Sequence, residues 1–143
     1  MTRENETFEL QDFLPYLLNQ AAEVSSLEFQ QIYKNRYGML RTEWRVLFHL
    51  GLYGCMTAKE IGQRAKIHKT KVSRAVAKLA KRRFVTRERD PDDRRFEYLE
   101  LTGTGQSAYR DLRGVAQKYD AALASRFSPD EIQALRDMLR KLA

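Results

Sequence analysis

The fold is decided by His68-Lys69-Thr70-Lys71-Val72-Ser73-Arg74-Ala75-Val76-Ala77-Lys78-Leu79, which is followed along the chain by Asp90-Pro91-Asp92-Asp93-Arg94-Arg95. The first segment has the spacing of a helix with one apolar side and one side of cations and hydroxyls. The second has the residues of a hairpin turn that presents arginines. A helix that fits the major groove, followed by a basic hairpin, is typical of a winged helix-turn-helix that binds duplex DNA.

The helix expected from His68 to about Arg83 has two different faces. Its apolar side carries Val72, Ala75, Val76 and Leu79. The residues expected to contact DNA are Lys69, Thr70, Lys71, Ser73, Arg74, Lys78 and Lys81. A solvated helix face usually mixes charge signs, because opposite charges one turn apart attract each other. The absence of any acid from this face favours DNA contact over a solvated amphipathic helix, with the first half of the helix at base edges and the lysines of its second half at phosphates.

Two β-prone segments, over residues 84–89 and 95–101, bracket the hairpin turn. Asp90 and Pro91 suit the first two positions of a type I turn. We expect Asp92 to accept a hydrogen bond from Arg94 and so to direct that guanidinium into the minor groove. The wing residues expected to contact DNA are Asp92, Arg94 and Arg95. The alternative is an ordinary turn with an exposed ion pair of little energetic value.

The positive charge is concentrated in the same region. Residues 57–96 hold 14 of the 26 Lys and Arg of the chain but only 5 of its 19 Asp and Glu, a net charge of +9 against +7 for the whole chain. The remainder is slightly acidic. A basic block within a nearly neutral frame indicates a polyanionic partner.

Length and composition limit the other possibilities. The 143 residues suit one domain, residues 1–143. No run of about 18 apolar residues could span a membrane, and the polar segment from Met1 to Glu9 lacks the apolar core of a signal peptide. The single cysteine, Cys55, excludes an internal disulfide and a cysteine-rich zinc site. We therefore expect a cytoplasmic protein with no metal, no cofactor and no membrane contact.

Helices account for most of the remaining chain, so the expected fold class is mainly α with a small β-hairpin wing. They are expected over about 12–33 with Asp12 as cap, over 42–53 with Gly51 and Gly54 at the end, over 57–66 after a Thr57–Glu60 capping box, over 102–126, and from Ser128 onwards. The first and last helices carry apolar stripes that a compact winged lobe, about 42–101, leaves unpartnered. We therefore expect helices over about 10–36 and 104–143 to form the core of a homodimer.

Three segments resemble one family of regulators. They are Tyr37 to Leu47, the run from Thr57 through Val72-Ser73-Arg74, and Asp90 to Arg95 followed by Leu101-Thr102 and Gly105. These segments resemble the second helix, the helix-turn-helix and the wing of MarR-type (multiple antibiotic resistance) regulators. The resemblance covers nearly the whole chain. It implies a homodimer that binds a pseudo-palindromic operator, most simply as a repressor, under the control of a small ligand or of cysteine oxidation.

Two positions depart from that family pattern. His68 stands where many members have an acidic residue or Ser, just before the helix that contacts DNA. The peroxide-sensing members have a reactive cysteine early in the first helix, and this chain has none there. Cys55 is better interpreted as a small buried hydrophobe than as a redox centre.

An aromatic ligand pocket is a further possibility, between the dimer core and the lobe. Its expected lining residues are Tyr16, Gln20, Trp44, Arg45, Phe48 and His49. Aromatic walls with one cation suit an aromatic carboxylate, although core packing of Trp44 and Phe48 is the favoured interpretation.

Other functions are less consistent with the sequence. An enzyme is disfavoured, because two histidines and one cysteine form no recognisable catalytic motif. A winged protein-interaction module, or a non-specific nucleic-acid-binding protein without ligand control, remains the alternative.

Overall fold

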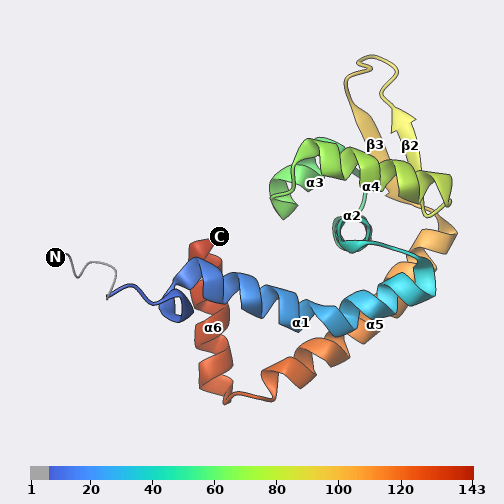
Figure 1. Ribbon diagram of the computed structural model, residues 1–143. Helices are drawn as coiled ribbons and strands as arrows, with labels where there is room; N and C mark the ends of the chain where they lie inside the picture. The colour runs from blue at the N-terminus through green and yellow to red at the C-terminus, as the bar shows by residue number, and fades with distance from the viewer. Residues whose placement is uncertain (1–6) are drawn as a thin grey trace.

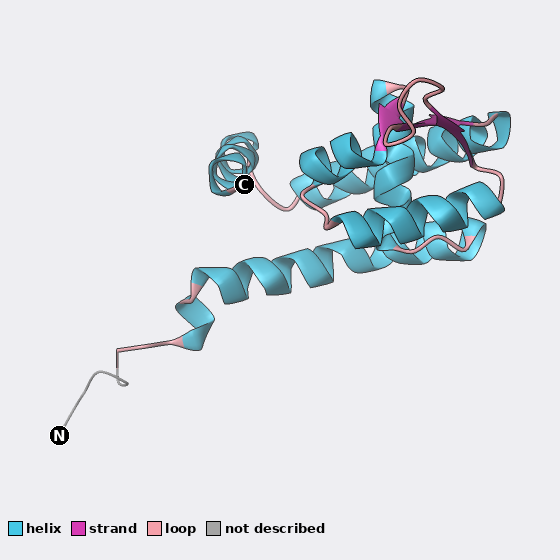
Figure 2. Ribbon diagram, turned by 90° about the horizontal axis from the view of Figure 1, so that it is seen from above, coloured by secondary structure: helices cyan, strands magenta, loops and turns pink. Residues whose placement is uncertain are grey.

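The computed structural model describes residues 7–143 and is mainly helical with one small sheet (Figure 1). The elements are η2 Leu10–Asp12, α1 Leu14–Tyr37, α2 Arg41–Tyr53, β1 Met56–Thr57, α3 Ala58–Ala65, α4 Lys69–Lys81, β2 Val85–Arg89, β3 Glu97–Leu101, α5 Gly103–Ala124 and α6 Pro129–Leu142. A lobe made of α2–α4 and the sheet lies against the long helices α1 and α5 (Figures 1 and 2). The end of α6 reaches the lobe, where the carbonyl oxygen of Ala143 accepts a hydrogen bond from Nζ of Lys66. The expected winged helix-turn-helix fold is confirmed. Residues 1–6, which include most of the polar segment before Leu10, lie outside the described residues.

Local hydrogen bonds explain where most helices begin. The N–H of Glu60 donates to Oγ1 of Thr57 (3.2 Å), and the N–H of Glu131 donates to Oγ of Ser128 (3.2 Å), so both capping boxes are confirmed. The expected cap at Asp12 is wrong. Asp12 ends a short 3-10 turn, and α1 begins after Phe13 without a side-chain cap. Pro15 in its first turn has no N–H, so one fewer donor is left unpaired there.

The sheet has three strands in the order β1-β3-β2, and all pairs are antiparallel. The hairpin places Val85 opposite Leu101 and Arg89 opposite Glu97. The sequence predicted this hairpin but missed β1, which pairs Met56 with Leu99. A strand of two residues directly before a capping box is too short to show an alternating pattern.

The core of the lobe forms around the inner side of α4. Val72, Ala75, Val76 and Leu79 are all nearly inaccessible to solvent, as predicted. They pack in one apolar cluster with side chains from α2, α3, β3 and α5, among them Leu47, Leu50, Ile61, Leu99 and Leu112. Because this side of α4 is fully buried, its opposite side must face outward.

Two glycines allow α5 to approach the lobe closely. Gly51 lies inside α2 rather than at its end, and a Cβ there would fall 2.4 Å from the ring of Tyr109 on α5. Only Gly54 ends α2. At the start of α5, a Cβ on Gly105 would fall 2.1 Å from the carbonyl oxygen of Phe84. These contacts fix how the lobe sits on α5.

Apolar side chains remain exposed at both ends of the described chain. Val24 on α1 is 67 % exposed and Leu142 on α6 is 62 % exposed. The other large apolar residues exposed in these regions are Phe8, Leu10, Phe13, Leu14, Leu17, Leu18, Leu27, Phe127, Leu135, Met138 and Leu139. α6 has no buried residue. None of the helices within residues 7–143 is both long enough and apolar enough to cross a bilayer.

Candidate nucleic-acid interface

The outward face of α4 is a surface of unpaired cations. Lys69, Lys71, Arg74, Lys78 and Lys81 are exposed, and within residues 7–143 none of them makes an ion pair. Thr70 and Ser73 are exposed beside them. Some arginines elsewhere are neutralised by acids, since Arg36 pairs with Asp111, Arg87 with Glu97 and Arg136 with Asp120. Others, such as Arg110 and Arg113 on α5, make no ion pair within residues 7–143, but they are not gathered with the cations of α4 on one helix face. Positive charge therefore stays uncompensated on this face, as a polyanion-binding surface requires.

The turn between α3 and α4 sets the start of this face. Lys66 adopts left-handed backbone angles (φ 55°) and ends α3. The N–H of Thr70 then donates to Nδ1 of His68 at 3.1 Å, so the imidazole caps α4. An accepting Nδ1 must carry a lone pair, which places the ring proton of neutral His68 on Nε2. His68 thus replaces the more usual acidic or hydroxyl cap, a role that the sequence analysis missed.

The tip of the wing differs from the expected arrangement. The Arg95 guanidinium makes a two-point contact with Asp93, with Nη2 to Oδ2 at 2.8 Å and Nε to Oδ1 at 2.9 Å. The expected hydrogen bond from Arg94 to Asp92 is wrong, because the described residues give Arg94 no ion pair at all. Asp93 is bonded to Arg95 because the backbone N–H of Arg95 also donates to Asp93 (3.1 Å), which brings the two side chains together.

Asp90 holds the hairpin loop from its first position. Its Oδ1 accepts the N–H groups of Asp92 (2.8 Å) and Asp93 (3.3 Å), and its Oδ2 accepts the Tyr98 hydroxyl (3.2 Å). The backbone-bonded turn runs from Asp93 to Phe96 instead of Asp90 to Asp93, with the Phe96 N–H donating to the Asp93 carbonyl (3.1 Å). The acids of the wing therefore hold its shape, and the side chain of Arg94 is left exposed without a partner within residues 7–143.

The residues expected to line a ligand pocket are only partly together. A hollow of about 250 Å³ is lined by Ala22, Ser26, Phe29, Tyr33, Arg41, Trp44 and Arg45. Trp44 and Arg45 thus line it, whereas Gln20 donates to the hydroxyl of Tyr16 (3.0 Å) elsewhere on α1. Phe48 packs edge-on against Trp44 and Tyr109. Nδ1 of His49 lies 2.6 Å from the Arg45 carbonyl oxygen, and its ring lies near Tyr53.

Two arginines make this hollow electropositive. Desolvation by burial lowers the pKa of Arg45, and the neighbouring Arg41 cation lowers it further. Nη2 of Arg41 lies 3.7 Å from Glu23, too far for a strong ion pair, and 3.3 Å from the Ser26 hydroxyl. An anion in the hollow would offset the repulsion between the two cations. No sequence pattern indicated a binding role for Arg41, Tyr33 or Phe29, because their spacing on α1 and α2 is that of ordinary helix surface or core.

The expected burial of Cys55 is wrong, because the residue is exposed, directly before β1. Partial desolvation and the nearby Glu100 raise the pKa of its thiol above the usual value. A raised thiol pKa disfavours the thiolate, which is the nucleophilic form.

Known proteins are similar to this chain in sequence. The family model described as the MarR family matches residues 37–95. The transcriptional regulator YkoM of Bacillus subtilis is 31 % identical over 105 residues, which is 73 % of this chain and 68 % of YkoM. The chain belongs to the MarR family. These relatives are transcriptional regulators, not enzymes.

Two further relatives differ in how much of their length the chain covers. The chain is 26 % identical to YwaE of Bacillus subtilis over 75 % of its own length but spans only 63 % of YwaE. It is 24 % identical to the homoprotocatechuate degradative operon repressor of Escherichia coli, over 92 % of this chain and 88 % of the repressor.

Solved structures agree with the fold. The transcriptional regulator PA4135 has a TM-score of 0.78 at 27 % identity, over 91 % of this chain and 95 % of that one. A MarR mutant from Escherichia coli, solved with operator DNA, has a TM-score of 0.79 at 20 % identity over 90 % and 92 % of the two chains. NadR, solved with 4-hydroxyphenylacetate, has a TM-score of 0.78 at 22 % identity over 95 % and 96 %. The last two likenesses concern the fold alone.

The cap on α4 gives a first prediction. His68→Ala should lower the free energy of unfolding by about 1 kcal/mol, because the Thr70 N–H loses its acceptor. His68→Asn should stay within a few tenths of wild type, since the amide oxygen can accept the same bond. Urea unfolding at pH 8 measures both. Equal stability of the two variants would show that the imidazole does not cap the helix.

Proposed function

We propose that the protein is a homodimeric repressor that acts in the cytoplasm, binds a pseudo-palindromic DNA operator and is released by a small aromatic carboxylate. The observation that carries the proposal is the outward face of α4. Its cations are unpaired and its hydroxyls exposed, while its opposite side is locked in the core. A protein-interaction module would not need so much uncompensated charge on this helix.

DNA contacts follow from the direction of α4. Thr70, Ser73 and Arg74 lie on its first half, the end that usually meets base edges in the major groove. Arg74 is the best candidate for a guanine contact, because its planar fork matches the two acceptors on that base. Arg94 on the wing is proposed to enter the minor groove, where negative potential attracts an unpaired guanidinium. An E. coli MarR mutant of the same fold was solved with operator DNA, which supports DNA as the partner.

The proposed dimer uses the exposed apolar ends of the chain, over about 10–36 and 104–143. A single chain leaves the stripes of α1 and α6 in water, and a two-fold partner would cover both. The winged lobe, about 42–101, is then free to contact DNA on each protomer. Repression is supported by the name of the E. coli homoprotocatechuate operon repressor.

The proposed effector site is the hollow beside Arg41 and Arg45. It combines aromatic walls from Phe29, Tyr33 and Trp44 with two cations that repel each other. A ligand with an aromatic ring and one carboxylate fits both features. NadR was solved with 4-hydroxyphenylacetate, a compound of this class.

The DNA proposal is tested by separating base contacts from phosphate contacts. An operator is first selected from random duplexes, and binding is then measured on a set of single-base operator variants at several KCl concentrations. Arg74→Ala should cost about 1–3 kcal/mol of specific affinity and relax the preference at one base pair per half-site. Lys81→Ala should weaken all sequences alike and reduce the salt slope by about one unit. Identical sequence profiles for the two variants would leave only a non-specific cationic face.

The effector proposal has its own optical test. Trp44 is the single tryptophan of the chain and lines the hollow, so its fluorescence reports directly on occupancy. Titration with 4-hydroxyphenylacetate should change the emission saturably, whereas the neutral analogue 4-hydroxyphenylethanol should not. Arg45→Gln should weaken the response about tenfold or more, because a charge-assisted hydrogen bond is lost. Arg113→Gln on α5 is the matched control. A response to the neutral analogue equal to that of the acid would contradict the proposed role of the arginines.

A further inference from the structure

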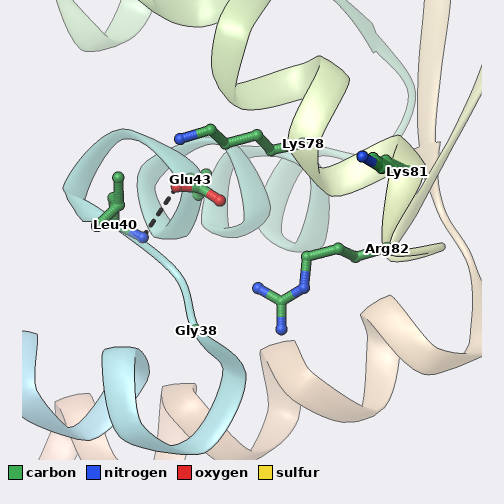
Figure 3. Close-up of a pocket in the computed structure, with 6 residues that line it drawn as sticks. All are labelled: Gly38, Leu40, Glu43, Lys78, Lys81 and Arg82. Carbon is green, nitrogen blue, oxygen red and sulfur yellow. Dashed lines mark hydrogen bonds between the residues drawn. The ribbon is translucent and has the colours of Figure 1, made fainter.

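A second hollow, also of about 250 Å³, lies where the end of α4 faces the end of α1 and the start of α2 (Figure 3). It is lined by Gly38, Leu40, Glu43, Lys78, Lys81 and Arg82. Three of these six residues are cations from the last turns of α4 and its cap. The hollow is separate from the one beside Arg41 and Arg45, and the two share no lining residue.

Arg82 is held in place by packing and not by an ion pair. A Cβ on Gly38 would fall 2.9 Å from its Nη1 and 3.1 Å from its Nη2, so the guanidinium lies directly against that glycine. On another side its central carbon lies 5.3 Å from the ring centroid of Phe84. Within residues 7–143 its guanidinium N–H groups donate to no acceptor. A guanidinium that is positioned but unsatisfied is well suited to bind an anion.

The charge of the hollow is positive. Glu43 is its single acid and is only 3 % exposed, and its Oε2 accepts the N–H of Leu40 at 3.0 Å (Figure 3). Lys78 and Lys81 make no ion pair with it or with any other acid in the described chain. Figure 3 shows Lys78 and Arg82 extending from the end of α4 toward the start of α2 and Gly38. Three cations therefore surround one acid that is already bonded to the backbone.

We propose that this hollow binds a phosphate group, and that Arg82 is the residue that clamps it. The hollow presents one fork-shaped guanidinium and two ammonium groups. A phosphate has enough acceptor oxygens to bind all three cations, whereas a single carboxylate has only two oxygens. With α4 in the major groove, its end passes over the strand that borders the groove, so a backbone phosphate of DNA is the expected source. If the phosphate belongs to DNA, the inference rests on the proposed function. A free phosphate ion carries the same acceptor oxygens and could bind the same three cations.

Whether the bound phosphate belongs to DNA is tested with a random-sequence 30-base-pair duplex. Its binding is followed by fluorescence anisotropy over a series of KCl concentrations. Arg82→Gln should bind about tenfold more weakly at the lowest salt and reduce the salt slope by about 0.9. Arg82→Lys, which keeps the charge but loses the fork, should keep the slope and lose less affinity. Arg113→Gln, the same charge change on α5, should match wild type. Far-ultraviolet circular dichroism verifies that each variant is folded.

Whether the hollow binds a free phosphate ion is tested with inorganic phosphate in the absence of DNA. Saturable shifts of the Gly38 amide and Arg82 Nε–H resonances, lost in Arg82→Gln, together with unchanged duplex binding, would assign the site to free phosphate. If Arg82→Gln binds the duplex like wild type and phosphate shifts neither resonance, the phosphate site is wrong. If wild type itself binds no duplex, the proposed function fails, and the phosphate titration alone then decides the site.

Discussion

The burial of one side of α4 is the constraint on which the rest of the structure depends. Val72, Val76 and Leu79 are removed from water, and burial of each such side chain contributes about 1.5–3 kcal/mol. That energy fixes the rotation of the helix about its axis. The cations and hydroxyls on the opposite side are then presented outward together, whatever their mutual repulsion costs in the free protein.

The cations of α4 differ from those elsewhere by their position on one face and not by ion pairing alone. Arg87 on β2 pairs with Glu97 and Arg36 on α1 pairs with Asp111, whereas Arg110 and Arg113 on α5 are exposed and make no ion pair within residues 7–143. At the tip of the wing, Arg95 is bonded to Asp93, and Arg94 makes no ion pair within residues 7–143. On α4 the unpaired cations lie together on one face, opposite the buried side of the helix.

Packing connects the aromatic hollow to the contact between the lobe and α5. Trp44 lines the aromatic hollow and packs edge-on against Phe48, which packs in turn against Tyr109 on α5. The same tyrosine ring closes on Gly51, where the lobe meets α5. The aromatic hollow and the contact between the lobe and α5 are therefore parts of one continuous packed cluster.

The sequence predicted the parts of the fold that depend on local patterns. The two faces of α4, the capping boxes at Thr57 and Ser128, and the hairpin all follow from spacing and turn chemistry within a few residues. It could not predict features that depend on distant neighbours. Gly51 seemed to be a helix end because its contact, Tyr109, is 58 positions away in the chain. No local pattern predicted a binding role for Arg82 or Arg41, because the residues around each of them come from another helix. At the wing the sequence predicted the right residue types but the wrong acid–arginine pair.

The central claim is that a two-fold dimer places two α4 helices in successive major grooves. Hydroxyl-radical footprinting on a selected operator tests it most directly. The expected result is protection of an inverted repeat whose half-site centres lie about 10 base pairs apart, on one face of the duplex. Protection of a single half-site, or of DNA without an inverted repeat, would contradict it.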